Sequence, residues 1–474
     1  MLGLKNTLWN SVSGMTTSQA GLSTVGHNIA NADTEGYSRQ TVQIGNRGPF
    51  RIFTGSEQPS QAGQGARVVN ITRSHSTFLE RQLLRDRLNR GFHEGRRESL
   101  KVFEGIFNNG SSATVGDSID TFFNSARELS QDPSSPSARR MLTEHAQQVT
   151  RDFNNAAQDA RLIQEDIDRT IGNRLEQINE LAKVIAEANA RVGNVEATGQ
   201  SANDFRDHRD QAIKKIAELA DVRVFQQESG LVSVDLANGF ALVRDEISST
   251  LRTLPDPNND GLFAIEHVSI GGTVSDITTT ISSGEIGGLL DVRDNLIPAH
   301  VEELDNLAFS FTEEVNAIHR AGFGLDGVGG RDFFAPLAGA AGAAAAIQVD
   351  ANVVGDPDQI AAATDPNAVP GDNRNMHALT DLQLGSIAGL GNSTFSQFFG
   401  ELTRSVGFVV ENNANFAEIH GARFDQSEAL RESIEGVSLD DEMVDLSRFQ
   451  KHFEASARVM STVNRLMDEV LQLV

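Results

Sequence analysis

The stretch MLGLKNTLWNSVSGMTTSQAGLSTVGHNIA, residues 1–30, has the spacing of a helix that packs along another helix. One row carries an apolar side chain at every seventh position: Met1, Leu8, Met15, Leu22 and Ile29. The companion row is mostly small and polar but includes Val25. Such a repeat is typical of a coiled-coil seam. Lys5 is the only Lys, Arg, Asp or Glu before Asp33, so the other faces lack the charge of a solvent-exposed helix. We therefore expect neighbouring subunits to cover these faces.

The end of the chain repeats this pattern. Apolar residues again fall every seven positions: Leu439, Leu446, Phe453, Met460, Met467 and Val474. The companion row holds Phe449, Ser456, Val463 and Val470, with Glu442 as the exception. A chain that begins and ends in seams predicts that its two ends pair as a coiled coil, although two core helices of a compact domain would give the same spacing. The predicted axial interface is Leu8, Met15, Leu22, Val25, Ile29, Leu446, Phe449, Phe453, Met460, Val463, Met467 and Val470.

Between the ends the pattern indicates a helical rod with a β-rich insert. Apolar residues step by threes and fours from about residue 138 to 193, which predicts one helix of roughly 80 Å at about 1.5 Å per residue. From residue 221 the sequence alternates and carries turn signals, as strands do. Helical patterns return after 289, interrupted by a stretch rich in Gly, Ala, Asp and Pro at 323–372.

The predicted fold class is α+β, mainly α, with paired terminal helices, an elongated rod and a small β domain. The expected domains are a terminal coiled-coil domain (1–60 with 436–474), a helical rod (61–220 with 289–435), a β-rich outer domain (221–288) and a loop-rich insert (323–372).

Composition excludes several classes of protein. A formal charge of −25, with 65 acidic residues, argues against a nucleic-acid binder and against adhesion to anionic membranes. The absence of cysteine excludes disulfides, thiolate metal sites and a cysteine nucleophile. No apolar run approaches the roughly 18 residues of a membrane span, and the N-terminus has no apolar core of a cleaved signal peptide.

Motifs for catalysis are absent, so we predict a protein that is not an enzyme and binds no cofactor. One segment resembles a metal site, because Asp256, Asn258, Asp260 and Gly261 match the first positions of a calcium loop. The twelfth position is His267 rather than a bidentate acid, and an Asx turn between strands explains the same residues. We therefore assign no metal, with weak calcium binding as the alternative.

Several motifs resemble those of one family. STVGHNIANADTEGYSRQTV (23–42) is similar to the N-terminal signature of the bacterial flagellar axial proteins, which comprise rod, hook and hook-associated subunits. Five further stretches resemble the hook-associated branch at the hook–filament junction: NDFRDHRDQ (203–211), GGLLDVRD (287–294), GGRDFF (329–334), DNRN (372–375) and residues 437–471. The sequence departs from that pattern at 205–206, and its segment between 334 and 372 is shorter than in relatives with an extra outer domain.

The resemblance implies a structural subunit of the flagellum, outside the cell, that forms a ring of copies between hook and filament. Its partners would be the hook protein, the next hook-associated protein, an export chaperone and the flagellar type III secretion apparatus, with no cleaved signal peptide. The resemblance also singles out a signature turn that leads the chain out of the inner tube: Asn28, Asn31, Gly36, Tyr37 and Arg39. Asp207, Arg209 and Asp210 form a charge cluster at a helix start, for which salt bridges at the junction of helix and β domain are the expected role.

Other functions stay open at this point. A hook or distal-rod subunit is the nearest alternative, although we expect such subunits to carry more β structure and less of the long helix. A secreted calcium-binding adhesin, or an enzyme on a helical stalk, is a further alternative that depends on the loop after Pro255.

Overall fold

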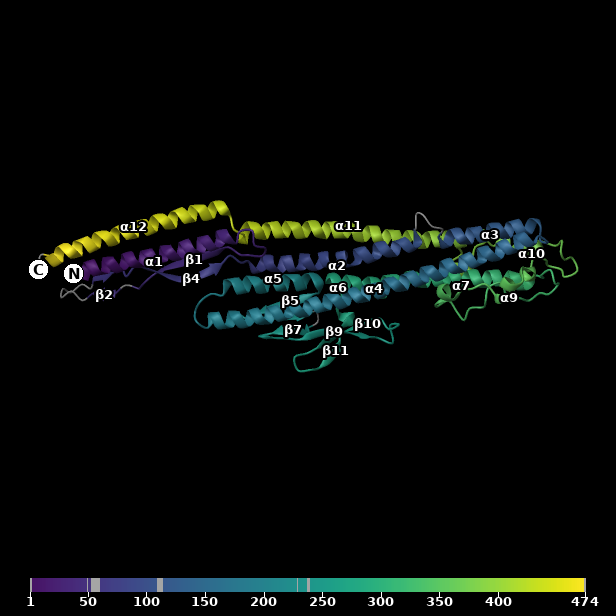
Figure 1. Cartoon of the computed structure of the whole chain (residues 1–474), viewed down its shortest axis with the longest axis horizontal. Helices are drawn as coiled ribbons and strands as arrows, with labels where there is room; N and C mark the ends of the chain where they lie inside the picture. The colour runs from purple at the N-terminus through teal and green to yellow at the C-terminus, as the bar shows by residue number, and fades with distance from the viewer. Residues whose placement is uncertain are drawn as a thin grey trace.

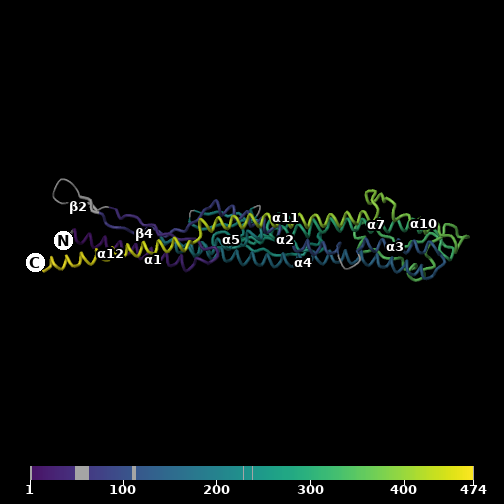
Figure 2. Tube along the Cα trace, turned by 90° about the horizontal axis from the view of Figure 1, so that it is seen from above, coloured from purple at the N-terminus to yellow at the C-terminus, as the bar shows by residue number. Residues whose placement is uncertain are grey.

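The structure is a computed structural model that describes residues 2–48, 50–52, 60–108, 114–227, 229–236 and 239–472. The predicted seam positions Met1 and Val474 therefore lie outside the described residues. The molecule is elongated, with most helices along its long axis and both ends of the chain at the same tip (Figure 1). A view turned by 90° shows the same narrow outline (Figure 2). No helix in the described ranges is long and apolar enough to cross a membrane.

At the tip, the first and last helices pack side by side (Figure 1). These are α1 (Leu2–Ala30) and α12 (Leu439–Gln472). They run antiparallel, because Asn28 contacts Glu442 whereas Gly14 lies against Ser456. The predicted pairing of the two ends is therefore confirmed.

A β-hairpin lies along α1. Its strands β1 (Gln40–Asn46) and β4 (Ala66–Arg73) pair antiparallel, and β2 (Phe50–Ile52) and β3 (Ser60–Ala62) extend it. Ser13 of α1 accepts a hydrogen bond from the Ala66 N–H at 3.1 Å. The domain boundary expected between residues 60 and 61 falls within β3 and stays a prediction.

The rod is built around α4 (Pro136–Glu196), a helix of 61 residues that extends roughly 90 Å. Ser135 caps its N-terminus and Pro136 occupies the first turn, where a missing N–H costs nothing. An apolar stripe is buried along it, including Leu142, Phe153 and Ile171. The other rod helices are α2 (Thr77–Phe107), α3 (Val115–Gln131), α5 (Asn203–Leu219), α6 (Gly284–Asp291), the π segment η3 (Val292–Leu296), α7 (Ile297–Ala321), α10 (Arg374–Asp381) and α11 (Phe395–Glu435).

Two small antiparallel sheets, formed by strands between residues 222 and 276, pack against α4 (Figure 1). One has the strand order β5 (Val222–Gln226), β6 (Val232–Leu236), β7 (Ala241–Arg244), β8 (Ile247–Ser248). The other has the order β11 (Val274–Asp276), β10 (Phe263–Val268), β9 (Thr250–Pro255), and the short helix η2 (Thr278–Thr280) follows it. The predicted class, mainly helical with a few small antiparallel sheets, is confirmed.

Residues 323–372 pack onto the far end of the rod. They hold the short helices α8 (Ala343–Ala346), α9 (Ala351–Gly355) and η4 (Pro357–Gln359), and η5 (Ala388–Leu390) follows α10. Phe333 and Phe334, just inside this segment, are fully buried against Phe122 of α3, and Phe334 also contacts Phe311 of α7. The segment therefore shares the core of the rod.

Candidate functional site

The packed face of the terminal pair differs from the apolar row that the sequence emphasises. On α1 the companion row is buried, including Ser11, Ser18 and Val25, whereas the apolar row Leu8, Met15, Leu22 and Ile29 is half-buried. On α12 the companions Phe449 and Val463 are buried, and the other predicted interface residues Leu446, Phe453, Met460, Met467 and Val470 are half-buried. On both helices, part of the predicted interface is thus left half-exposed at the edge of the pair.

Small residues on α1 allow this close approach. A Cβ atom on Gly21 would lie 2.5 Å from the ring of Phe449, and one on Gly14 would lie 2.7 Å from Oγ of Ser456. Real Cβ contacts are not that short, so α12 sits in a groove that only glycine leaves open. The row of α1 that contains Gly14, Gly21 and Asn28 therefore lies against α12, and the apolar row is displaced to the side.

A buried carboxylate lies at the end of the α1–α12 pair, where α12 begins. Glu442 is 0% exposed, and it occupies the position that breaks the companion row. Arg39 Nε donates to its Oε1 at 2.6 Å, and Asn28 Nδ2 donates to its Oε2 at 3.0 Å. A buried charge is tolerated when it is paired and hydrogen-bonded in this way. Glu442 thus joins the last helix to the signature turn.

The side chain of Asn28 is bound by Tyr37 and by the backbone of Gln40. The Tyr37 hydroxyl donates to Asn28 Oδ1 at 2.8 Å, and the Gln40 N–H donates to the same oxygen at 3.0 Å. Burial raises the pKa of Tyr37 well above its usual range, and the negative charges of Asp204, Asp207 and Glu442 add to this effect. The phenol is therefore protonated, and able to donate, at every physiological pH.

The turn itself needs a glycine. Gly36 has a φ of +76°, a left-handed conformation that costs an L side chain free energy. A Cβ atom there would also lie 2.5 Å from the Gln211 side chain of α5, whose amide donates to the Glu35 carbonyl. Asn31 closes α1 by donating its side-chain N–H to the His27 carbonyl at 3.0 Å. The turn is thus pressed directly against α5.

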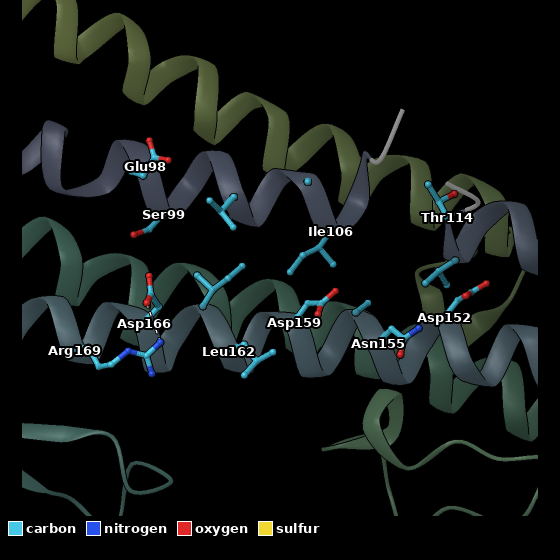
Figure 3. A pocket seen from close by; sticks show the side chains of 15 residues that line it. Glu98, Ser99, Ile106, Thr114, Asp152, Asn155, Asp159, Leu162, Asp166 and Arg169 are labelled. Carbon is cyan, nitrogen blue, oxygen red and sulfur yellow. Dashed lines mark hydrogen bonds and ion pairs between the residues drawn. The ribbon is translucent and has the colours of Figure 1, made fainter. Parts of the chain in front are cut away.

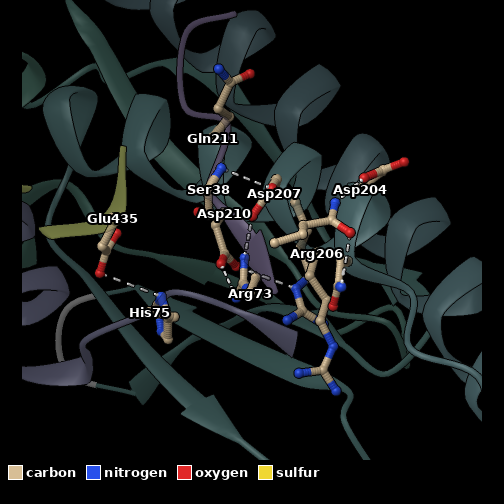
Figure 4. A network of polar contacts seen from close by, with 12 residues as sticks. Ser38, Arg73, His75, Asp204, Arg206, Asp207, Asp210, Gln211 and Glu435 are labelled. Carbon is tan, nitrogen blue, oxygen red and sulfur yellow. Dashed lines mark hydrogen bonds and ion pairs between the residues drawn. The ribbon is translucent and has the colours of Figure 1, made fainter. Parts of the chain in front are cut away.

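The charge cluster of α5 meets the same turn (Figure 4). Arg73, at the end of β4, donates at 2.6 Å to Asp207 and at 2.6 Å to Asp210, and Ser38 N–H donates to Asp207 at 3.2 Å. Burial raises the pKa of Asp207, and the Arg73 charge opposes that rise. We call Asn28, Tyr37, Arg39, Arg73, Asp207, Asp210 and Glu442 the junction network.

Arg209 joins this cluster to the β domain, because its Nε lies 3.6 Å from Asp210 Oδ1. It is 2% exposed and donates to the Gly230 carbonyl at 3.0 Å and to Asn189 Oδ1 at 3.2 Å. Its role is to fix the β domain to α4.

Several residues of this region have no obvious sequence signal. Glu435, the last residue of α11, is 1% exposed and accepts the Ser76 N–H at 2.6 Å, while its carbonyl accepts the Arg39 N–H at 2.8 Å. Arg73 and Glu435 lie in ordinary-looking charged stretches. Glu442 alone had a signal, since it interrupts an apolar row.

The calcium-like loop is a turn between β9 and β10. Asp256 Oδ1 accepts the Asn258 N–H at 2.9 Å, and Asp260 and Gly261 have left-handed backbone. His267 is buried within 3.0 Å of Ser249 Oγ. The Asx turn is therefore the arrangement that the loop adopts. Among the described residues, one group is spaced to hold a metal ion, formed by His75, Glu80 and Glu435, and Lys214 Nζ already lies 3.5 Å from Glu80.

A groove opens along the rod. It measures about 780 Å³ and runs between α2 and α4, lined by carboxylates such as Asp159 and Asp166 and by aliphatic side chains such as Leu162 and Ile106 (Figure 3). Its described lining includes no histidine, lysine or cysteine.

The chain matches three family models. Residues 100–334 match the model described as the helical domain of flagellar hook-associated protein FlgK. Residues 430–473 match that of the C-terminal region of flagellar basal body rod FlgEFG proteins, and residues 8–37 match that of flagella basal body rod proteins. The two terminal matches cover most of the helices that pair at the tip.

Curated relatives match almost the whole chain. Flagellar hook-associated protein 1 of Bacillus subtilis is 25% identical over 96% of this chain and 96% of its own length. The protein of the same name from Escherichia coli is 24% identical over 98% of this chain and 99% of its own. A solved structure, the flagellar hook junction protein FlgK from Burkholderia pseudomallei, has 26% identity and a TM-score of 0.47 over 53% of this chain and 46% of that chain.

Proposed function

Because the chain belongs to the family of flagellar hook-associated protein 1, we propose that it is a structural subunit of the bacterial flagellum that forms the junction between hook and filament. It carries out no chemical reaction in this role. The observation that carries the proposal is the antiparallel α1–α12 pair, tied by Glu442 and Arg39 to the turn that leads into the rod. Such a subunit holds two helical assemblies together through packing alone.

The junction network transmits load in this proposal. Arg73 links the hairpin beside α1 to α5 of the rod, and Glu442 links α12 to the turn after α1. A twist applied to the terminal pair thus reaches the rod through charge-assisted hydrogen bonds, which are stronger than neutral ones. The half-buried residues of the predicted axial interface remain for contacts with neighbouring copies.

The partners and the route follow from the same family membership. As a flagellar axial protein the chain belongs to an extracellular appendage, and its neighbours are components of hook and filament. We infer that it contacts the hook protein on one side and the next hook-associated protein on the other. We also infer that a chaperone and the flagellar type III apparatus export it without a cleaved signal peptide.

Deletion of the gene tests the proposal. Cells without the protein should keep their hooks and shed filament subunits into the medium, and the full chain should restore filaments. A chain that lacks α1 and α12 should not restore them. The matched control is Asp256→Ala in the β9–β10 turn, far from the tip, which should restore them fully. Normal filaments on the deletion strain would contradict the proposal.

Two observations separate this role from its rivals. The match of residues 100–334 to a hook-associated helical domain, and the single helix α4 within it, favour the junction over a hook or distal-rod subunit. Against the calcium-binding alternative we propose that the loop is a structural Asx turn, in which Asp256 Oδ1 accepts hydrogen bonds from the backbone and side-chain N–H groups of Asn258. In a calorimetric titration with calcium chloride, the parent chain and the Asp256→Ala variant should therefore give the same heats of injection.

A further inference from the structure

Two exposed patches at the level of the junction network have opposite character. Phe78 at the start of α2 is 73% exposed, and Arg81 and Arg85 lie three and seven residues further along the same face. Neither arginine forms an ion pair or a side-chain hydrogen bond with any described residue. An exposed phenylalanine beside two unpaired cations is unexpected in a chain with a charge of −25. We call these three residues the α2 patch.

The second patch lies at the start of α12. Leu439, Met443 and Val444 are 53%, 58% and 68% exposed. Asp440 and Asp441 are exposed between them and have no ion pair among the described residues. Acidic residues in the first turn suit the helix dipole, but that preference does not explain the apolar side chains around them. We call these five residues the α12 patch.

The two patches lie at one level of the long axis. Residues just before α2 contact the end of α11: Ser74 Oγ donates to the Ile434 carbonyl at 3.0 Å, and Ser76 N–H donates to Glu435 at 2.6 Å. The α2 patch begins two residues after Ser76, and the α12 patch begins four residues after Glu435. Each points away from its own core, because Leu79 and Leu83 of α2 and Glu442 of α12 are the buried positions.

We propose that the α2 patch of one copy binds the α12 patch of the next copy. Two identical patches would repel each other. A pair of α2 patches would bring arginines together, and a pair of α12 patches would bring aspartates together. Paired with each other, they bury Phe78 against Met443 and Val444 and place Arg81 and Arg85 near Asp440 and Asp441. A contact between different surfaces repeats from copy to copy around an axis, as in a ring. The inference rests on the proposed function for the place of this ring in the flagellum.

Crosslinking between two differently tagged chains tests the contact. The chain has no cysteine, so thiols introduced by Phe78→Cys in one chain and Val444→Cys in the other are unique. Both chains are produced together in flagellated cells of the deletion strain and treated with a short bismaleimide. We expect a mixed-tag dimer in at least tenfold higher yield than from two Phe78→Cys chains. The matched control replaces Val444→Cys with Leu384→Cys, which is 84% exposed near the far end of the rod and should give no mixed dimer.

Charge reversal gives an independent measure. Arg81→Glu with Arg85→Glu in the Phe78→Cys chain should lower the mixed-dimer yield about tenfold, and Asp440→Arg with Asp441→Arg in the other chain should restore it. Arg81→Gln with Arg85→Gln should give an intermediate loss, and circular dichroism checks that each chain is folded.

Three outcomes would overturn the contact. They are equal yields from matched and control pairs, a preferred dimer of two Phe78→Cys chains, and a crosslink from Phe78→Cys to a different flagellar protein. Filament attachment is scored on the same cells. If filaments stay attached while the mixed dimer is missing, the contact is wrong and the junction role stands.

Discussion

At the scale of single residues, the least expected feature is the use of one asparagine as a hub. Asn28 accepts from Tyr37 and from the Gln40 N–H, and donates to Gln40 and to Glu442. It is 1% exposed, so all of these bonds are made away from water. Buried hydrogen-bond networks define a single geometry, because a partly satisfied arrangement is costly. The hydrogen bonds of Asn28 therefore fix the orientation of α1, α12 and the turn relative to one another.

Tyr37→Phe tests this hub. Loss of one hydrogen bond should cost about 1 kcal/mol of unfolding free energy near neutral pH. The raised pKa of Tyr37 also sets a pH dependence. Its stabilisation is complete below the unfolded pKa of about 10 and is lost as pH rises above that value, since only the unfolded phenol ionises there.

Tyr37 is the only tyrosine, so tyrosinate absorbance reports it directly. In the folded protein the absorbance should appear only together with unfolding, as followed by circular dichroism. Tyr37→Phe should lose less stability between neutral and alkaline pH than the parent chain. A phenol that titrates near its ordinary pKa in the folded protein would contradict the hub.

The sequence indicates part of this residue-scale picture. The resemblance pointed to Asn28, Gly36, Tyr37 and Arg39, and the structure brings them together at one place. It did not point to Arg73 or Glu435, because their partners lie more than a hundred residues away and no local pattern encodes such pairs. Arg209 combines both kinds of contact, since its ion pair joins it to the next residue, Asp210, whereas its hydrogen bonds reach Asn189 and Gly230, 20 and 21 residues away.

At the scale of elements, periodicity predicted the helices well and their faces less well. The long helix was expected at 138–193 and spans Pro136–Glu196, because Ser135 and Pro136 mark its start. In α1 the seven-residue repeat defines two rows at once, and within the single chain the row of larger apolar residues is only half-buried. Which row faces α12 depends on the space that Gly14 and Gly21 leave for side chains of α12. That space depends on the residues of both helices, so the sequence of α1 alone does not reveal it.

Gly21→Ala should weaken the α1–α12 pair. The added methyl group would meet the Phe449 ring at 2.5 Å, so we expect a cost of about 1–3 kcal/mol, as for an overpacked core. The matched control is Gly26→Ala on the same helix, where a Cβ atom meets nothing within 4 Å. That variant should stabilise the helix by up to about 1 kcal/mol.

Hydrogen exchange of α1 amides measures both changes, and it should speed up for Gly21→Ala and slow down for Gly26→Ala. Equal exchange in the two variants would mean that α12 does not pack on the glycine face.

At the scale of the whole molecule, the tip is the part of the chain that its own packing covers least. Trp9, the only tryptophan, is 58% exposed on α1, and the apolar row beside it is half-buried. In the proposed role, neighbouring subunits cover this surface. The rod and its far end, by contrast, have a continuous buried core that needs no partner.

Trp9 fluorescence measures this covering. Emission should be that of a largely hydrated indole in dilute solution and should shift to shorter wavelength when the purified chain assembles on isolated hooks. Hooks assembled with the Trp9→Phe protein give the background emission from tryptophans of the other proteins, which is subtracted. An unchanged emission maximum after assembly would show that α1 stays uncovered.

The contact of the first helix with the last has a consequence for the order in which the chain acquires its shape. Asn28 and Glu442 are 414 residues apart, so their meeting closes a very long loop and is entropically costly until the intervening chain is compact. Neighbouring elements such as α3, α4 and α5 fold by local contacts well before that. Whichever of the two helices is available first, the tip therefore cannot close until the other one is present as well. A closed α1–α12 pair thus reports that both helices, and the chain between them, are in place.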